Sequence, residues 1–220
     1  MTEYHVPLFN RISRAIITPI FRGIFKLISK VELTGLENIP PDPYVLVFNH
    51  VSLFEAPIIV AHWPSHPEIL GASNVWKRPG QNILAFLYGG IPINRGAVDR
   101  TAFHKMVAAV KSGHSLILSP EGTRSYTPGM QKAKSGITYI FDKTGVKILP
   151  VGIVGSTEDF LKNALKGRRP HATVAVGKPF TLPVFEETGK TRSELRQEKV
   201  DYVMRKIAEL LPPEYRGYYS

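Results

Sequence analysis

The stretch YVLVFNHVSLFEAPIIVAH, from Tyr44 to His62, decides the fold of this chain. Its first five residues are an unbroken apolar run, which is typical of a strand buried on both faces of a parallel sheet. Polar residues follow at once, and Ser52 is a suitable N-cap for a helix that ends near His62. The sequence therefore predicts a buried strand that leads through a short polar loop into a helix.

The same alternation of strand and helix continues along the rest of the chain. We expect strands at 68–72, 91–94, 115–119, 148–154 and 172–177, and helices at 81–88, 99–111, 133–143, 157–166 and 193–211. This order predicts an α/β domain with a mixed, largely parallel central sheet flanked by helices. Active loops in such a sheet lie at the carboxyl ends of the strands. The tail, residues 212–220, is interpreted as a surface extension.

The composition limits the chemistry and the partners. The chain has 220 residues and no cysteine, which excludes disulfides, thiolate metal sites and a cysteine acyl-enzyme. Its 28 Lys and Arg against 18 Asp and Glu give a net charge of +10, which favours anionic partners. No pattern of an RNA- or DNA-binding module occurs, and no apolar run is long enough to span a bilayer. We expect a phospholipid surface or a phosphorylated substrate, and no nucleic acid.

Residues 8–30 have the spacing of an amphipathic helix and contain no acidic residue. Apolar side chains lie mainly opposite a purely basic face, a pattern that suits a helix lying in the plane of an anionic membrane. Pro19 is expected to kink or divide it. We interpret residues 1–34 as a membrane-associating anchor; an ordinary helix packed on the domain is the alternative. The basic residues expected to contact lipid are Arg11, Arg14, Arg22, Lys26 and Lys30.

His50 follows the buried strand directly and has a carboxylate five residues later, at Glu55. That carboxylate can reach back to His50 Nδ1 and leave Nε2 free to accept a proton from a hydroxyl. Imidazole has an ordinary pKa of about 6.5, which suits a general base near neutral pH. The same residues also match a plain capping box, Ser52-x-x-Glu55, which needs no chemistry.

The motif SPEGTRS, Ser119 to Ser125, follows another predicted strand. Gly122 allows close approach of the backbone to a ligand, Thr123 supplies a hydroxyl, and Arg124 has the donor geometry that matches a phosphate. Glu121 is a candidate to orient Arg124 or to accept from a glycerol hydroxyl. Arg95, in the motif GGIPINRG, is a candidate second phosphate contact. Each of these motifs by itself also fits a surface turn.

Together, in this order, these motifs resemble those of the glycerolipid acyltransferases typified by bacterial 1-acylglycerol-3-phosphate acyltransferase. The chain has the family's N-H-x-S block at Asn49 to Ser52 and its E-G-T-R block at Glu121 to Arg124. Pro92 and Arg95 match its arginine block, and ILPVGIVG, with Pro150, matches its proline-centred block. The resemblance spans about residues 33–177.

The resemblance implies an acyltransferase domain over residues 35–220. His50 would be the general base, oriented by Glu55, while Arg95, Glu121, Gly122, Thr123 and Arg124 would hold glycerol and phosphate. The acyl donor would be a thioester of coenzyme A or acyl carrier protein, with no cofactor, no metal and no acyl-enzyme. The acceptor would be 1-acylglycerol 3-phosphate and the product phosphatidate. We expect a peripheral, monotopic protein on the cytoplasmic face of a membrane, the bacterial inner membrane.

Two positions depart from the family pattern. The family's first block ends in aspartate, whereas this chain has Glu55, and Ser73 stands where the family often has a lysine. The longer side chain must be accommodated, because a misplacement of about 1 Å can cost about 100-fold in rate. Lys77 or Arg78 can replace the missing lysine.

Three alternatives remain open from the sequence. The same chemistry can act on glycerol 3-phosphate or on another lysophospholipid. A protein of another class, a non-catalytic binder of membrane surfaces, would also use the basic N-terminal helix. A serine hydrolase is disfavoured, because the chain has no G-x-S-x-G motif.

Overall fold

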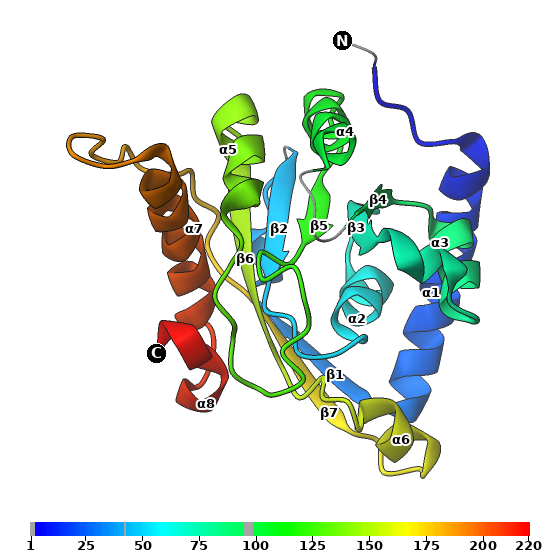
Figure 1. Ribbon diagram of the computed structural model, residues 1–220. Coiled ribbons are helices and arrows are strands. Elements are labelled where there is room, and N and C mark those ends of the chain that lie inside the picture. The colour runs from blue at the N-terminus through cyan, green and yellow to red at the C-terminus, as the bar shows by residue number, and fades with distance from the viewer. Residues whose placement is uncertain (1–2, 42, 95–98) are drawn as a thin grey trace.

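A single seven-stranded sheet forms the centre of the part of the chain that the computed structural model describes, residues 3–41, 43–94 and 99–220 (Figure 1). The strand order is β1-β7-β6-β2-β5-β3-β4. The strands are β1 (Lys30–Thr34), β2 (Tyr44–Phe48), β3 (Glu68–Ala72), β4 (Ile91–Ile93), β5 (Leu116–Leu118), β6 (Lys147–Val154) and β7 (His171–Val176). The five strands from β6 to β4 are parallel, and β7 pairs antiparallel with β6 and parallel with β1. The predicted α/β fold with a mixed, largely parallel sheet is confirmed.

Helices cover both faces of this sheet. They are α1 (Leu8–Ile28), α2 (Glu55–His62), α3 (Gln81–Tyr88), α4 (Arg100–Lys111), α5 (Thr138–Thr144), α6 (Phe160–Leu165), α7 (Arg192–Ala208) and α8 (Pro213–Arg216). Side chains alternate along β2, so that Val45 and Val47 join a core with α4, α5 and α7. Leu46 and Phe48 join a second core with α2, α6 and Phe25 of α1. Burial on both faces explains why β2 is apolar throughout.

The N-terminal segment is continuous with the domain. Strand β1 pairs with β7 along its whole length and so forms one edge of the sheet. Helix α1 contacts α2 and α3 and runs unbroken through Pro19, so the helix is not divided as expected. A boundary after residue 34 would assign β1 to the N-terminal anchor, although β1 is an edge strand of the sheet. Strand β1 went unrecognised because its alternating residues follow directly on the helical pattern.

The N-terminal half of α1 has a polar inner face. Arg14 is only 3 % exposed, and its Nη2 lies 3.0 Å from Glu68 Oε2 at the start of β3. Its Nε donates to the Tyr88 carbonyl, and the guanidinium lies 4.5 Å from the centre of the Tyr88 ring. The Tyr4 hydroxyl donates to the same Glu68 carboxylate. The prediction that Arg14 contacts lipid is therefore wrong, because this residue fastens α1 to the domain.

The outer face of α1 is apolar. Ile16 is 55 % exposed and Leu27 is 75 % exposed. The exposed stripe consists of Leu8, Phe9, Ile12, Ile16, Ile20, Ile24 and Leu27. Helix α3 extends this surface, because its exposed Phe86 contacts Phe9 with 5.2 Å between ring centres. Over the described residues, no helix combines the length and the apolar character that crossing a membrane requires.

The other predicted lipid contacts occupy different positions around this stripe. Arg11, Lys26 and Lys30 are exposed, although Lys30 belongs to β1 and not to the helix. Arg22 is exposed as well, but its Nε donates to the Ala61 carbonyl near the end of α2. Arg22 is therefore held against α2, whereas Arg11 and Lys26 lie exposed on the helix.

The C-terminal tail is part of the core and not the surface extension that we predicted. Tyr215 and Tyr219 are buried. The Tyr215 hydroxyl accepts the Gly155 N–H. The Tyr219 hydroxyl accepts the Ala133 N–H and donates to Asp201. These aromatic residues were assigned to the surface because the Pro-rich, polar tail has no helical periodicity.

Candidate active site

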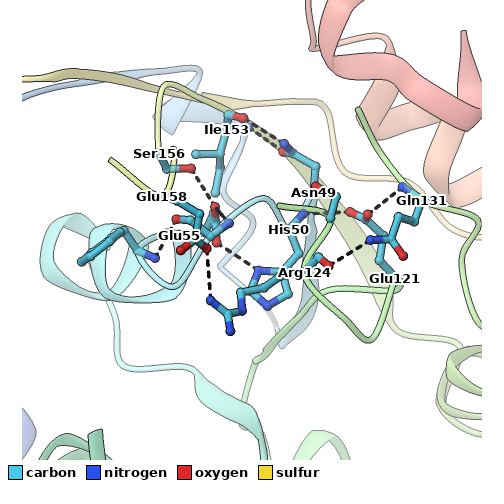
Figure 2. Close-up of polar contacts among 12 residues, drawn as sticks. Asn49, His50, Glu55, Glu121, Arg124, Gln131, Ile153, Ser156 and Glu158 are labelled. Carbon is cyan, nitrogen blue, oxygen red and sulfur yellow. Dashed lines mark hydrogen bonds and ion pairs between the residues drawn. The ribbon is translucent and has the colours of Figure 1, made fainter. Parts of the chain in front are cut away.

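The N-H-x-S and E-G-T-R motifs meet at the edge of the sheet where the parallel strands end. Strands β5, β2 and β6 are parallel neighbours, so their carboxyl ends lie side by side. His50 follows β2, Glu121 follows β5, and Ser156 follows β6 (Figure 2). Residues that are about 70 and 100 positions apart in sequence are therefore brought into contact.

His50 and Glu55 form the expected pair. His50 Nδ1 lies 3.0 Å from Glu55 Oε2, and the His50 side chain is 16 % exposed while that of Glu55 is fully buried. An ionised carboxylate can only accept at this contact, so the arrangement favours the tautomer with the proton on Nδ1 and a lone pair on Nε2. This is the tautomer that a general base needs. The contact with the carboxylate sets the orientation of the imidazole ring.

Glu55 does not form the capping box that the sequence also allowed, but it does use one oxygen for the Ser52 N–H and the other for His50. Its Oε1 accepts the Ser52 N–H at 2.7 Å, while Oε2 faces His50. Ser52 is not the N-cap residue that we predicted: α2 starts at Glu55, preceded by Phe54 as N-cap. The Ser52 hydroxyl accepts the Phe54 N–H inside the loop instead.

Asn49 joins this loop to strand β6. Its side-chain amide donates to the Ile153 carbonyl at 2.9 Å, and its oxygen accepts the Ile153 N–H at 2.7 Å (Figure 2). The fully buried Asn49 thus continues the pairing of β2 with β6 beyond the end of the strand. This pair of hydrogen bonds holds the backbone from which His50 projects.

Glu121 connects two loops of the site. Its buried carboxylate accepts the His50 N–H at 2.7 Å and the Gln131 N–H at 2.8 Å. Burial raises the pKa of Glu121 to about 7, while these two N–H groups lower it and the nearby Glu55 charge raises it. These two hydrogen bonds join Glu121 to the backbone of His50 and to the loop at Gln131, so its carboxylate supports the position of His50. Its predicted contact with glycerol or phosphate stays a prediction.

The rest of the E-G-T-R motif lies beside His50. Gly122 has a φ of +70°, a conformation that favours glycine, and the Ser125 N–H donates to the His50 carbonyl at 2.9 Å. Thr123 is half-buried, with its hydroxyl 3.4 Å from Gln131 Oε1. Arg124 is also half-buried. Its guanidinium donates to Glu158 at 3.1 Å and lies 4.6 Å from the centre of the Tyr126 ring.

Arg95, the candidate second phosphate contact, lies outside the described residues. Among the described residues, no three His, Asp or Glu side chains form a group that could hold a metal ion.

Sequence reasoning missed three polar residues of this site. Ser156 donates to Glu55, Glu158 pairs with Arg124, and Gln131 donates its side-chain amide to the Arg124 carbonyl. A signal existed for the first two, since they directly follow the strand β6, as His50 follows β2. It was not used because residues 157–166 were predicted to be a helix and Ser156 was left as the link to it.

Comparison with known proteins identifies the class. Residues 30–154 match the family model described as Acyltransferase. This match covers more than half of the chain and includes His50, Glu55 and the E-G-T-R motif, so the chain belongs to the acyltransferase family.

Several relatives within this family have the same name. A 1-acyl-sn-glycerol-3-phosphate acyltransferase of Borreliella burgdorferi is 30 % identical over 139 residues, which are 62 % of this chain and 56 % of that protein. One from Chlamydomonas reinhardtii is 29 % identical over 195 residues, 86 % of this chain and 55 % of that protein. The chain spans about half the length of the curated relatives that it matches.

A solved structure agrees over a larger share of both chains. The crystal structure of the 1-acyl-sn-glycerophosphate (LPA) acyltransferase PlsC from Thermotoga maritima has a TM-score of 0.62 and 25 % sequence identity. The similarity covers 93 % of this chain and 84 % of that one. The N-terminal helix and the sheet described above thus have the arrangement of a known acyltransferase fold.

Proposed function

We propose that this protein transfers an acyl chain from a thioester of coenzyme A or acyl carrier protein to the free hydroxyl of 1-acylglycerol 3-phosphate. The product is phosphatidate, a precursor of phospholipids. The observation that supports this most is the contact of His50 Nδ1 with Glu55 at the carboxyl edge of the sheet, beside the E-G-T-R loop. The names of the relatives support the choice of acceptor.

His50 is the catalytic residue in this proposal. Its Nε2 takes the proton of the acceptor hydroxyl while the hydroxyl oxygen attacks the thioester carbonyl carbon. The negatively charged Glu55 stabilises the imidazolium that forms. Collapse of the tetrahedral intermediate breaks the carbon–sulfur bond, and the imidazolium returns the proton to the leaving sulfur as a thiol. The ester forms in one transfer, without an acyl-enzyme.

The acceptor phosphate is assigned to the E-G-T-R loop. Arg124 supplies a guanidinium whose donors match a phosphate, and Gly122 and Thr123 supply backbone and hydroxyl groups nearby. In the absence of substrate, Arg124 pairs with Glu158, which is about half exposed. A phosphate replaces this partner at low cost, because an exposed carboxylate is easily rehydrated. Arg95 is proposed as a second contact from the sequence alone.

A membrane surface is the proposed location of the reaction. The apolar stripe of α1 and the adjoining Phe86 of α3 form a lipid-facing surface with Arg11 and Lys26 exposed on the same helix. Its occupant is an anionic phospholipid bilayer, because the helix has cations and no acidic residue. The acyl chains of the acceptor and the product reside in the same bilayer.

The decisive experiment measures thiol release from acyl-coenzyme A and acyl carrier protein thioesters by the purified protein. Release should depend on 1-acylglycerol 3-phosphate and fall by about 100- to 10,000-fold in His50→Ala, since that is the range contributed by a general base. His104→Ala, an exposed histidine on α4, is the matched control and should retain full activity.

The other outcomes separate the alternatives. Release that depends on glycerol 3-phosphate or a lysophospholipid with a larger head group, and not on 1-acylglycerol 3-phosphate, would change the acceptor but keep the chemistry. No release with any acceptor, from a folded protein that binds vesicles, would favour the non-catalytic membrane binder. Unchanged turnover in His50→Ala would remove the general base.

A further inference from the structure

The loop after β6 contacts the site from a part of the chain that no motif includes. Ser156 lies two residues beyond the region that matches the family model. Its side chain is buried, with 1 % exposed, and its hydroxyl donates to Glu55 Oε1 at 2.7 Å (Figure 2). A buried hydroxyl that donates to a buried carboxylate is a hydrogen bond of the folded interior and differs from a chance contact on the surface.

Two donors therefore hold one oxygen of Glu55. The Ser52 N–H and the Ser156 hydroxyl both reach Oε1 at 2.7 Å, from two directions. The torsion that turns a glutamate carboxylate is broad and has no sharp preference of its own. With Oε1 held by both donors, the other oxygen is directed at His50 Nδ1.

The loop that presents Ser156 is itself well fixed. The Gly155 N–H donates to the buried Tyr215 hydroxyl at 3.1 Å. Gly155 has a φ of +83°, and a Cβ there would lie 2.2 Å from the His171 carbonyl oxygen. Only glycine fits this turn, so the backbone before Ser156 is held between β7 and the C-terminal tail.

We propose that Ser156 is a positioning residue for acyl transfer, which holds the Glu55 carboxylate in the orientation that aligns His50. The inference rests on the proposed function. It also accounts for glutamate at a position where the family pattern has aspartate. Glutamate has one more rotatable bond and reaches about 1.5 Å further, and Ser156 supplies the extra constraint that the longer side chain requires.

The first test is the kinetics of Ser156→Ala. The value of kcat should fall by about 10- to 100-fold, because a misplaced base costs rate and not affinity. The KM values for thioester and acceptor should stay within about twofold. Ser29→Ala is the matched control: Ser29 is equally buried and donates to the Phe25 carbonyl, at the end of α1. This control should keep the wild-type kcat.

The second test asks whether Ser156 acts through Glu55. If it does, Ser156→Ala adds nothing to Glu55→Ala, so that the double variant has the kcat of Glu55→Ala alone. Multiplying losses in the double variant would overturn the proposal. Where Glu55→Ala does not fold, Glu55→Gln takes its place; where Ser156→Ala does not fold, Ser156→Cys does, since a thiol is a similar size and a weak donor.

A third test does not depend on catalysis and so separates this inference from the proposed function. The proton on His50 Nδ1 should give a downfield imidazole resonance in the NMR spectrum, assigned by its loss in His50→Ala. In Ser156→Ala this resonance should shift or broaden, while in Ser29→Ala it should not. An unchanged resonance in Ser156→Ala would refute the positioning role, even if the substrate proved to be different.

Discussion

Helices α1 and α7 pack on the same domain, but α7 buries its apolar face and α1 leaves its apolar face exposed. Helix α7 is conventional: it begins with a capping box at Thr191 and Glu194 and buries Val200, Val203 and Met204. Helix α1 buries Ser13, Arg14 and Thr18 besides Phe25, and it leaves four of its isoleucines exposed, namely Ile12, Ile16, Ile20 and Ile24. Of the two helices, only α7 has the apolar side buried and the polar side exposed, as is usual for a helix in contact with water.

The difference supports the proposal that the outer face of α1 lies against a membrane, whereas α7 faces water. An apolar stripe along the full length of a helix is costly in water and favourable in the interfacial region of a bilayer. Polar contacts then fasten the inner face, which has few apolar side chains to bury. The buried pair of Arg14 and Glu68 attaches α1 to the domain, whereas aliphatic side chains attach α7.

The largest expected effect comes from breaking the inner face of α1. Arg14→Ala leaves the Glu68 carboxylate buried without its partner, so the free energy of unfolding should fall by about 3 to 5 kcal/mol. Urea denaturation measures this change. Arg11→Ala, three residues earlier on the exposed side of the same helix, should change it by no more than about 0.5 kcal/mol. Equal effects in the two variants would contradict the assigned orientation of α1.

Exchanging apolar for polar residues should have opposite consequences in the two helices. Ile16→Ser with Ile20→Ser should leave the stability within about 1 kcal/mol but weaken vesicle binding roughly 30-fold, since each half-exposed isoleucine contributes about 1 kcal/mol. Val203→Ser in α7 should cost about 2 kcal/mol or more of stability and leave vesicle binding unchanged. Sedimentation with anionic vesicles and urea denaturation measure the two quantities. Vesicle binding that survives the changes in α1 would relocate the membrane surface.

The smallest effect should come from a single exposed cation. Lys26→Gln should weaken binding to anionic vesicles by about 1 kcal/mol, roughly fivefold, at low salt. The difference should vanish at high salt and with uncharged vesicles, because exposed charges are screened. Arg205→Gln, an exposed cation on α7, is the control and should bind as the wild type does. A loss of the same size in this control would mean that net charge, and not the surface of α1, sets the affinity.

Prediction from the sequence succeeded where a local pattern is enough. The apolar run at β2 and the alternation that follows it were sufficient for the α/β class, because parallel strands buried on both faces must be apolar. Strand β1 and the C-terminal tail were assigned wrongly because their contacts, with β7 and with Ala133 and Asp201, join distant parts of the chain. The same limit applies to Arg14, since only its partner Glu68 makes its burial tolerable.

In the active site, too, local features could be predicted and contacts between distant residues could not. His50 and Glu55 are five residues apart, so their contact could be anticipated from chain geometry. The roles of Glu121 and Ser156 could not be anticipated, because their partners His50 and Glu55 lie 71 and 101 residues away. The motif predicted a contact of Glu121 with the substrate, and the structure adds the hydrogen bonds of its carboxylate to backbone N–H groups.

By itself, the sequence determined the alternation of strands and helices, the pairing of a histidine with a nearby carboxylate, and an N-terminal helix with cations and no acids. These features depend on the periodicity and spacing of neighbouring residues. Only the tertiary structure decided which face of that helix is buried, that Glu121 supports the loop of His50, and that Ser156 holds Glu55. The physical reason is that a buried charge or hydroxyl takes its role from its hydrogen-bond partners, and folding selects those partners from anywhere in the chain.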